Sequence, residues 1–408
     1  IMIRKYGVLI LGVLLLLGYA CGPKPEPAPS APESTRPEAA APQPAAPESA
    51  SQEPIKVGAL FAVTGPASNL GEPERNTAKM IERQINEAGG INGRPLQVIV
   101  EDTEGDEKVA VTKINKLIKF DNVCAVIGPS RSGTSMAVKP IADENQVPLL
   151  SCAAAIEIVQ PLSKWVFKTP QNDSDCVIRI FEHMQTAGIT QIAIMGESTG
   201  FGQSGRAQLK KLAPDYGITI VADESYNPAD TDMTAQLTRI RGTAAQAVVN
   251  WSIVPAQSII PKNMKQLGMT IPLYQSHGFG NIRYAQAAGE AADGLIFPAG
   301  ALLVAESLPD THPRKALLMQ YKQDYESEFG ESASTFGGHA YDALHLVVNA
   351  LRAVGPDRAK IRDFIENTKG FHGTAGTFNF SPEDHCGLTK DAFEMITVKG
   401  GKFVPLQP

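Results

Sequence analysis

Short apolar runs alternate with amphipathic segments along most of the chain. The apolar runs are bounded by Gly, Pro, Ser and acidic residues, as expected for strands buried on both faces of a parallel sheet. The segments between them repeat apolar residues at helical spacing, as Ala78, Ile81 and Ile85 do. Alternation of strand and helix predicts a doubly wound α/β fold. The expected strands are residues 55–61, 96–101, 124–127, 147–150, 165–168, 191–195, 218–223, 247–251, 273–275 and 295–298.

The alternation falls into two runs. A break at Thr169-Pro170 separates them and predicts two lobes. The C-terminal end differs, because apolar runs at residues 374–380, 392–398 and 402–404 are joined by turn sequences and predict antiparallel strands. The expected helices are residues 73–88, 108–120, 136–145, 175–187, 203–213, 232–241, 256–267, 313–329 and 341–353.

The first residues have the pattern of an export signal. Arg4 and Lys5 precede an apolar run at residues 8–17, and small residues follow, which predicts a signal peptide over residues 1–20. An apolar run of roughly 10 to 12 residues is short for a bilayer core of ~30 Å, which favours a cleaved signal over a permanent anchor.

Ala20-Cys21 resembles the lipobox of bacterial lipoproteins and predicts lipidation of Cys21. Gly18 stands where Leu is usual in that motif, and signal cleavage without lipidation is the alternative. Residues 21–53 are almost entirely Pro, Ala, Glu, Ser and Gln, a composition too poor in apolar bulk to fold. We expect this segment to be an extended, disordered linker between a lipid anchor and the folded lobes.

Composition narrows the range of partners. A chain of 408 residues is longer than a single core of ~250–300 residues, which agrees with a tail and more than one domain. A net charge of -6, without a dense Lys/Arg block, argues against nucleic acid, and 6% aromatic residues argue against stacking platforms. The seven histidines are dispersed and no metal motif is present, so we expect no metal and no cofactor. Whether Cys124, Cys152, Cys176 and Cys386 form disulfides is left open.

The stretch CAVIGPSRSGTSMAVKPIADENQVPLLSCAAA, residues 124–155, predicts strand, loop, helix and strand, with both loops on one side. Ser130, Ser132 and Thr134 lead into the helix, so hydroxyl and unpaired N–H groups converge at a helix N-terminus, which attracts anions. The exit of the next strand, residues 151–155, has no bulk and leaves the backbone accessible. A small carboxylate fits this arrangement best; ordinary strand exits with solvated serines are the alternative.

One motif offers an enzyme hypothesis. Residues 196–200, GESTG, match G-x-S-x-G, the nucleophile elbow that would make Ser198 a hydrolase nucleophile. That elbow turns sharply from strand into helix, whereas Phe201-Gly202 is expected to prolong the loop here. We therefore expect no enzyme activity and keep the hydrolase as an alternative. The histidines without an assigned role in such a hydrolase are His277, His339, His345, His372 and His385.

From about Ile55 onward the chain resembles the periplasmic leucine/isoleucine/valine-binding protein family of ABC importers. The resemblance rests on the order and spacing of VGALFAVTGPASNLG, INEAGGINGRPLQVIVEDTEGD, AVIGPSRSGTS, VPLLSCAAA, GFGQSG and AYDAL. It implies the type I periplasmic binding fold, in which two similar α/β lobes, joined by a three-stranded hinge, close over a ligand and dock on a permease. The lobes implied are residues 54–169 with 301–375, and residues 170–300 with 376–408.

The resemblance also implies which residues bind the ligand. Ser132, beside Arg131, is similar to the family's carboxylate-binding serine, and Ala153-Ala154 to the segment that gives backbone contacts. Ala155 stands where the family has a second hydroxyl, from Thr.

Other positions of the implied pocket depart from the family pattern. Leu70 and Phe201 fall where binders of aliphatic amino acids often place aromatics, and Phe336 replaces a Tyr. His277 stands where the family has the acidic residue that binds the ligand's ammonium, and Trp251 lies at a nearby strand exit. These departures predict a flatter, more apolar pocket with less provision for a free amine.

Together these patterns predict a monomeric, lipid-anchored solute-binding protein of an ABC importer, in the periplasm or on the extracytoplasmic face of a membrane. We expect its ligand to be a small carboxylate, either a branched-chain amino acid or a related amine-free aromatic or aliphatic acid. A ligand-sensing receptor domain is a further alternative, although the sequence has no signalling helix or output domain.

Overall fold

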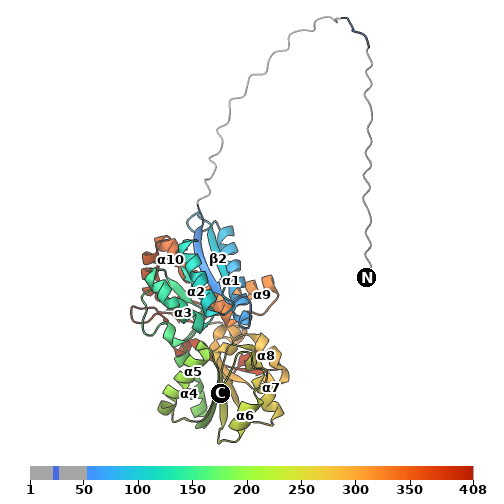
Figure 1. Ribbon diagram of the computed structural model, residues 1–408, viewed down its shortest axis with the longest axis vertical. Coiled ribbons are helices and arrows are strands. Elements are labelled where there is room, and N and C mark those ends of the chain that lie inside the picture. Colours follow the sequence, from blue (N-terminus) through green and yellow to red (C-terminus); the bar gives the residue numbers. More distant parts are fainter. Residues whose placement is uncertain (1–21, 27–52, 408) are drawn as a thin grey trace, which may run out of the picture. The chain divides into compact units, whose positions relative to one another are not determined.

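The computed structural model describes residues 22–26 and 53–407 (Figure 1). All the helices and strands described below lie between Ile55 and Pro405. The predicted signal peptide, Cys21 and nearly all of the predicted linker lie outside the described residues.

The first lobe is built on a five-stranded parallel sheet in the order β2-β1-β3-β4-β5. Apolar faces of the surrounding helices pack on it, and Ile81, Leu117 and Leu344 are fully buried in this core. Figure 1 shows α1, α2, α3 and α10 around this sheet. The strands are β1 (Ile55–Phe61), β2 (Leu96–Asp102), β3 (Val126–Ile127), β4 (Leu149–Ser151) and β5 (Val166–Lys168). The helices are α1 (Ser68–Glu87), α2 (Glu107–Lys119), α3 (Ser132–Glu144), α9 (Lys315–Phe329), α10 (Thr335–Val354) and α11 (Arg358–Glu366).

The second lobe has a seven-stranded sheet in the order β14-β13-β10-β9-β8-β6-β7. Its first five strands in sequence pair in parallel, and the two C-terminal strands add an antiparallel edge, as the sequence predicts. The strands are β6 (Gln191–Glu197), β7 (Thr219–Tyr226), β8 (Ala247–Trp251), β9 (Leu273–Gln275), β10 (Ile296–Gly300), β13 (Phe393–Lys399) and β14 (Lys402–Pro405). The helices are α4 (Asp173–Thr186), α5 (Gly200–Leu212), α6 (Thr234–Arg241), α7 (Ile260–Gln266) and α8 (Ile282–Ala288). The predicted α/β architecture with two parallel-sheet lobes is confirmed.

Several predicted elements were wrong in detail. The helix expected at 256–267 is a 3₁₀ turn, Pro255–Ser258, followed by α7, because Pro261 favours the first turn of a new helix. The strand expected at 374–380 is shorter than predicted: only β12 (Thr377–Phe378) forms within that range, and it pairs antiparallel with β11 (Phe371–His372).

Helix α1 begins at Ser68, five residues before the predicted start at Pro73. Proline has no N–H to donate, so within a helix it leaves the carbonyl four residues earlier without its usual partner. That carbonyl belongs to Asn69, and the Asn281 side-chain amide of the second lobe donates to it at 2.9 Å. The broken helical bond thus becomes a contact between the lobes.

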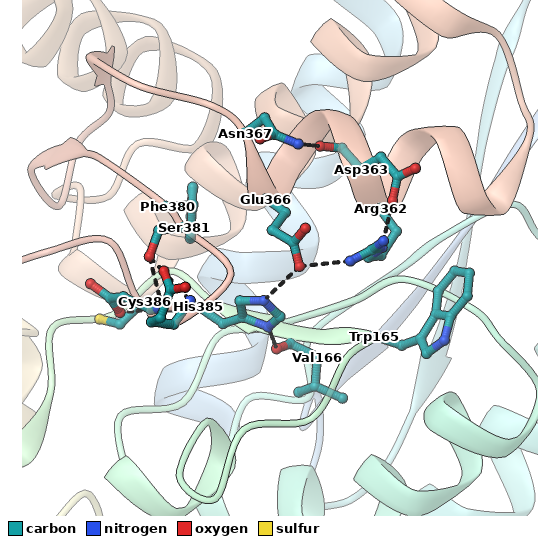
Figure 2. Close-up of polar contacts among 12 residues, drawn as sticks. Trp165, Val166, Arg362, Asp363, Glu366, Asn367, Phe380, Ser381, His385 and Cys386 are labelled. Atoms are coloured by element: carbon teal, nitrogen blue, oxygen red, sulfur yellow. Dashed lines mark hydrogen bonds and ion pairs between the residues drawn. The ribbon is translucent and has the colours of Figure 1, made fainter.

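A polar cluster fastens the segment between β12 and β13 to the first lobe (Figure 2). The buried His385 ring lies between the carbonyl oxygen of Val166, at 2.9 Å, and the Glu366 carboxylate, at 3.3 Å. Arg362 binds the same carboxylate at 2.6 Å and lies over the Trp165 ring. Apolar residues of this segment, including Phe380 and Leu388, belong to the first core, so the chain packs there before it enters β13. The lobe boundary at residues 375–376 stays a prediction.

The close approach of α1 to β1 requires glycine at position 71. A Cβ atom at Gly71 would lie 2.1 Å from the backbone carbonyl carbon and oxygen of Ala62. We expect Gly71→Ala to lower the free energy of unfolding by roughly 1–3 kcal/mol, because backbone must shift to relieve the clash. Urea denaturation measures this change. Gly242→Ala, whose Cβ would meet no atom closer than 3.3 Å, is the control, and equal midpoints for the two variants would contradict the packing described.

Candidate ligand-binding site

A narrow cavity lies between the two sheets. Most of its lining follows the carboxyl ends of parallel strands, where α/β folds place their ligands. The space in it that a water-sized sphere can occupy is about 20 Å³. The lining residues are Leu70, Ser130, Ser132, Cys152, Ala153, Ala154, Phe336 and His339 from the first lobe, and Pro170, Phe201, Ile253, His277 and Gly278 from the crossover and the second lobe.

Ser132 supplies a hydroxyl donor at the N-terminus of α3. Its oxygen accepts the N–H of Ala155 at 3.2 Å, which leaves its own proton free to point to a ligand. The first-turn N–H groups of α3 have no acceptor within the helix, and a helix N-terminus carries a partial positive charge. This end of the cavity is therefore suited to a carboxylate.

Ser130 has a different role from Ser132. Its oxygen accepts the Ala62 N–H at 2.9 Å, and its hydroxyl donates to the Glu74 carboxyl group. Glu74 is completely buried, and burial raises its pKa well above the usual range. A neutral Glu74 adds no negative charge behind the carboxylate end of the cavity.

The loop after β4 presents backbone to the cavity, and its Ala153 and Ala154 amides differ. The Ala153 N–H is bound by the Ser151 hydroxyl at 3.1 Å, whereas no acceptor for the Ala154 N–H is found among the described residues. The Ala154 N–H is thus the amide of this pair that remains for a ligand.

Lys168 holds the same loop from behind. Its ammonium group is fully buried and donates to the carbonyl oxygens of Ala154 and Gln171, which lie before and after the crossover between the lobes. Burial lowers the pKa of Lys168, and no carboxylate of the described residues lies within ion-pair distance. Asp173 and Glu157 act on it only from further away.

Two histidines line the cavity from opposite lobes. His277 follows β9, and its ring lies among Phe201, Trp251 and Phe393, at centroid distances of 5.5, 5.7 and 5.6 Å. His339 belongs to α10. Burial, followed by the charge of Lys168, lowers the pKa of His277 well below its usual range and that of His339 to about 3. Both rings are therefore neutral at pH 7.

Seven of the ten sequence-predicted binding residues meet at this cavity. Three do not line it: Arg131 donates to the Gly105 carbonyl at 2.9 Å, Ala155 is fully buried behind Ser132, and Trp251 is fully buried beside His277. The binding role of all ten stays a prediction. Six lining residues were not among the predicted binding residues, namely Ser130, Cys152, Pro170, Ile253, Gly278 and His339, although Ser130 and Cys152 lie in the stretch 124–155 that the sequence predicts to form the site. Cys152 and Ile253 could have been predicted from their positions just after strand ends. No feature of the sequence indicated His339.

Ser198 does not have the surroundings of a nucleophile. The helix after it begins at Gly200, so the expected prolonged loop was wrong and the turn is short. The Ser198 side chain is exposed and donates to the Asn227 amide oxygen at 3.3 Å, with no histidine contact among the described residues. Cys124, Cys152, Cys176 and Cys386 are free and buried.

The described residues include neither a metal-binding cluster nor a membrane-spanning helix. No cluster of three or more His, Cys, Asp or Glu side chains is arranged to hold a metal ion there. No helix in that part of the chain has the length and apolarity needed to cross a membrane.

Comparison with known proteins identifies relatives across the whole folded unit. The model of the periplasmic binding protein family matches residues 54–402. The leucine-, isoleucine-, valine-, threonine- and alanine-binding protein of Pseudomonas aeruginosa is 27% identical over 331 residues, which cover 80% of this chain and 85% of the relative. The Leu/Ile/Val-binding protein BraC3 of Rhizobium johnstonii is 24% identical, covering 86% and 93%.

Solved structures agree with this assignment. An extracellular ligand-binding receptor from Rhodopseudomonas palustris HaA2 superposes with a TM-score of 0.82 at 27% identity, covering 86% of this chain and 99% of the receptor. The branched-chain amino acid transporter substrate binding protein LivJ of Streptococcus pneumoniae, in complex with isoleucine, gives 0.75 at 25% identity, covering 86% and 97%. The family match over residues 54–402, on a chain with two α/β lobes, shows that this chain belongs to the periplasmic binding protein family.

Proposed function

We propose that this protein is the lipid-anchored solute-binding component of an ABC importer and captures a small carboxylate that lacks a free amine. The lobes hold the ligand in the cavity described above and deliver it to a membrane permease. The protein works as a monomer, without a cofactor, on the extracytoplasmic side of a membrane.

The carboxylate part of the proposal is supported by the donors at the first-lobe end of the cavity. The Ser132 hydroxyl, the Ala154 N–H and the N-terminus of α3 surround one region and have no protein acceptor that would compete with a ligand. The buried Lys168 adds a positive charge nearby that no direct ion pair neutralises.

The composition of the cavity wall supports a ligand without a free amine. No Asp or Glu is among the lining residues, and the neutral His277 stands at the position that the family resemblance gives to an acid. An ammonium group taken out of water without a carboxylate partner is costly. The buried charge of Lys168 would repel it further.

A branched-chain amino acid is the alternative ligand, because the relatives in Pseudomonas and Rhizobium are named for binding leucine, isoleucine and valine. The wall leaves backbone carbonyls and the two histidines as acceptors for its ammonium. These are weaker partners than a carboxylate, since hydrogen bonds between charged groups are roughly twice as strong as neutral ones.

Calorimetry with the full-length chain tests the ligand class. Phenylacetate, benzoate and 4-methylpentanoate are expected to bind at least tenfold more tightly than leucine, isoleucine and valine. Ser132→Ala should weaken the binding of the acids at least tenfold, because a donor to a charged group contributes roughly 1.5–3 kcal/mol. Ser198→Ala is the matched control outside the cavity. Tight binding of the three amino acids alone would contradict the proposal.

The charge state of the cavity gives a pH prediction for His339→Gln in the ligand-free protein. The pKa of His339 lies below its unfolded value, so acid favours the unfolded state and wild-type stability is lost as pH falls through 6.5. Between pH 7 and pH 5 the wild type should lose about 2 kcal/mol relative to the variant. Urea denaturation at both pH values measures this, with the exposed His372→Gln as control. A constant difference would mean that His339 is not buried as a neutral ring.

The anchor is tested separately with Cys21→Ser. The expected native product has a lipid-modified Cys21 at its N-terminus and partitions with membranes, whereas the variant should be released into the soluble fraction. Mass spectrometry of the N-terminal peptide and membrane fractionation provide the measurements. A variant that still sediments fully with membranes, or a native peptide without added lipid mass, would contradict lipidation.

A further inference from the structure

The ligand cavity contains a second set of polar groups, apart from the carboxylate end. His277 reaches the cavity from the strand exit of β9 and His339 from α10, so the two rings belong to different lobes. They are 7% and 6% exposed. Both ring nitrogens of His277 and the Nδ1 atom of His339 are buried without a hydrogen-bond partner among the described residues.

The protein around His277 fixes the ring but does not satisfy it. Phe201, Trp251 and Phe393 meet it edge to face, with interplanar angles of 74°, 77° and 67°, and such carbon surfaces offer its nitrogens no ordinary partner. Lys168, whose charge acts on the His277 ring, already donates to two backbone carbonyls. Native proteins rarely leave buried polar atoms without a hydrogen-bond partner. Histidine nitrogens that lack a partner and line a ligand cavity therefore indicate that a group of the ligand binds them.

We propose that His277 and His339 form a second subsite, which binds an uncharged oxygen carried by the ligand in addition to its carboxylate. This inference rests on the proposed function and specifies its ligand as a hydroxy or keto acid. The first lobe would then bind the carboxylate, and the histidines of both lobes would bind the second oxygen.

The chemistry of the pair favours an uncharged oxygen over a second anion. Each neutral imidazole has one N–H donor and one acceptor nitrogen, and a hydroxyl group both accepts and donates. Burial and the charge of Lys168 hold both rings in the neutral form. A second carboxylate would bring another negative charge into the cavity without a cation free to pair with it, which is costly in a closed site.

Two matched ligand pairs test the subsite, namely benzoate with 4-hydroxybenzoate and hexanoate with 6-hydroxyhexanoate. Calorimetry on the full-length wild type should show at least tenfold tighter binding of the hydroxy acid in one or both pairs. A site that binds a substrate hydroxyl discriminates strongly against the analogue that lacks it, because its own polar groups are then left unpaired. His277→Phe keeps a ring among the three aromatics and should reduce the preference for the hydroxy acid to less than threefold.

The outcomes separate this inference from the proposed function. If the parent acids bind but neither hydroxy acid is preferred, or if His277→Phe weakens both members of a pair equally, the subsite is overturned and carboxylate binding stands. If no carboxylate binds, the proposed function itself fails. Terephthalate binding more tightly than 4-hydroxybenzoate would overturn the uncharged oxygen. If His277→Phe does not fold, His339→Phe repeats the test. His372→Gln is the control. The wild-type comparison of acid and hydroxy acid tests the subsite even without variants.

Discussion

Lys168 places a fully buried ammonium group where the chain leaves the first lobe, and much of the site depends on how that charge is accommodated. Removal of an ion from water costs several kcal/mol even after the protein relaxes, so its donors must be bound. The carbonyl oxygens of Ala154 and Gln171 do this. One of them lies in the loop after β4 and the other just beyond the crossover, so a single side chain ties the cavity wall to the hinge. Burial, with the Lys168 charge as a smaller contribution, lowers the pKa of His277 and of His339 and keeps both rings neutral, and the same charge favours an anionic ligand.

The fold follows from the sequence pattern because its determinants are local. Each parallel strand is a short apolar run, and each helix has an apolar face, so alternation alone predicts two doubly wound lobes. The predicted element boundaries are wrong where a contact with a distant part of the chain determines where the element begins. Helix α1 extends before Pro73 because Asn281, more than two hundred residues away, binds the carbonyl that proline leaves free. Such a partner has no signal in the residues around Pro73.

The site was predictable to the extent that it follows strand ends. Ser132, Ala154, Phe201 and His277 all stand just after strands, where an α/β sheet places its ligand, and all line the cavity. Trp251 is the last residue of β8 and is buried in the second core. Its position near a strand end therefore led to the wrong expectation that it lines the cavity. His339 lies in the apolar run of α10 and resembles any buried helix position until the opposite lobe is placed against it.

The interactions that favour a closed cavity differ in their dependence on ligand. Arg283 joins Glu72 at 2.9 Å and Glu331 at 2.7 Å, but all three side chains are more than a third exposed, and ion pairs of that kind contribute about 0–1 kcal/mol each. None of these three residues lines the cavity, so a solute takes no part in their contacts. A ligand shifts the equilibrium between open and closed lobes only through interactions that differ between the two states. In the open state water satisfies Ser132, His277 and His339; in the closed state their free donors and acceptors have only the ligand. In the proposed function, a solute that matches those groups would therefore favour closure, and selectivity would arise from the polar atoms that the protein itself leaves unpaired.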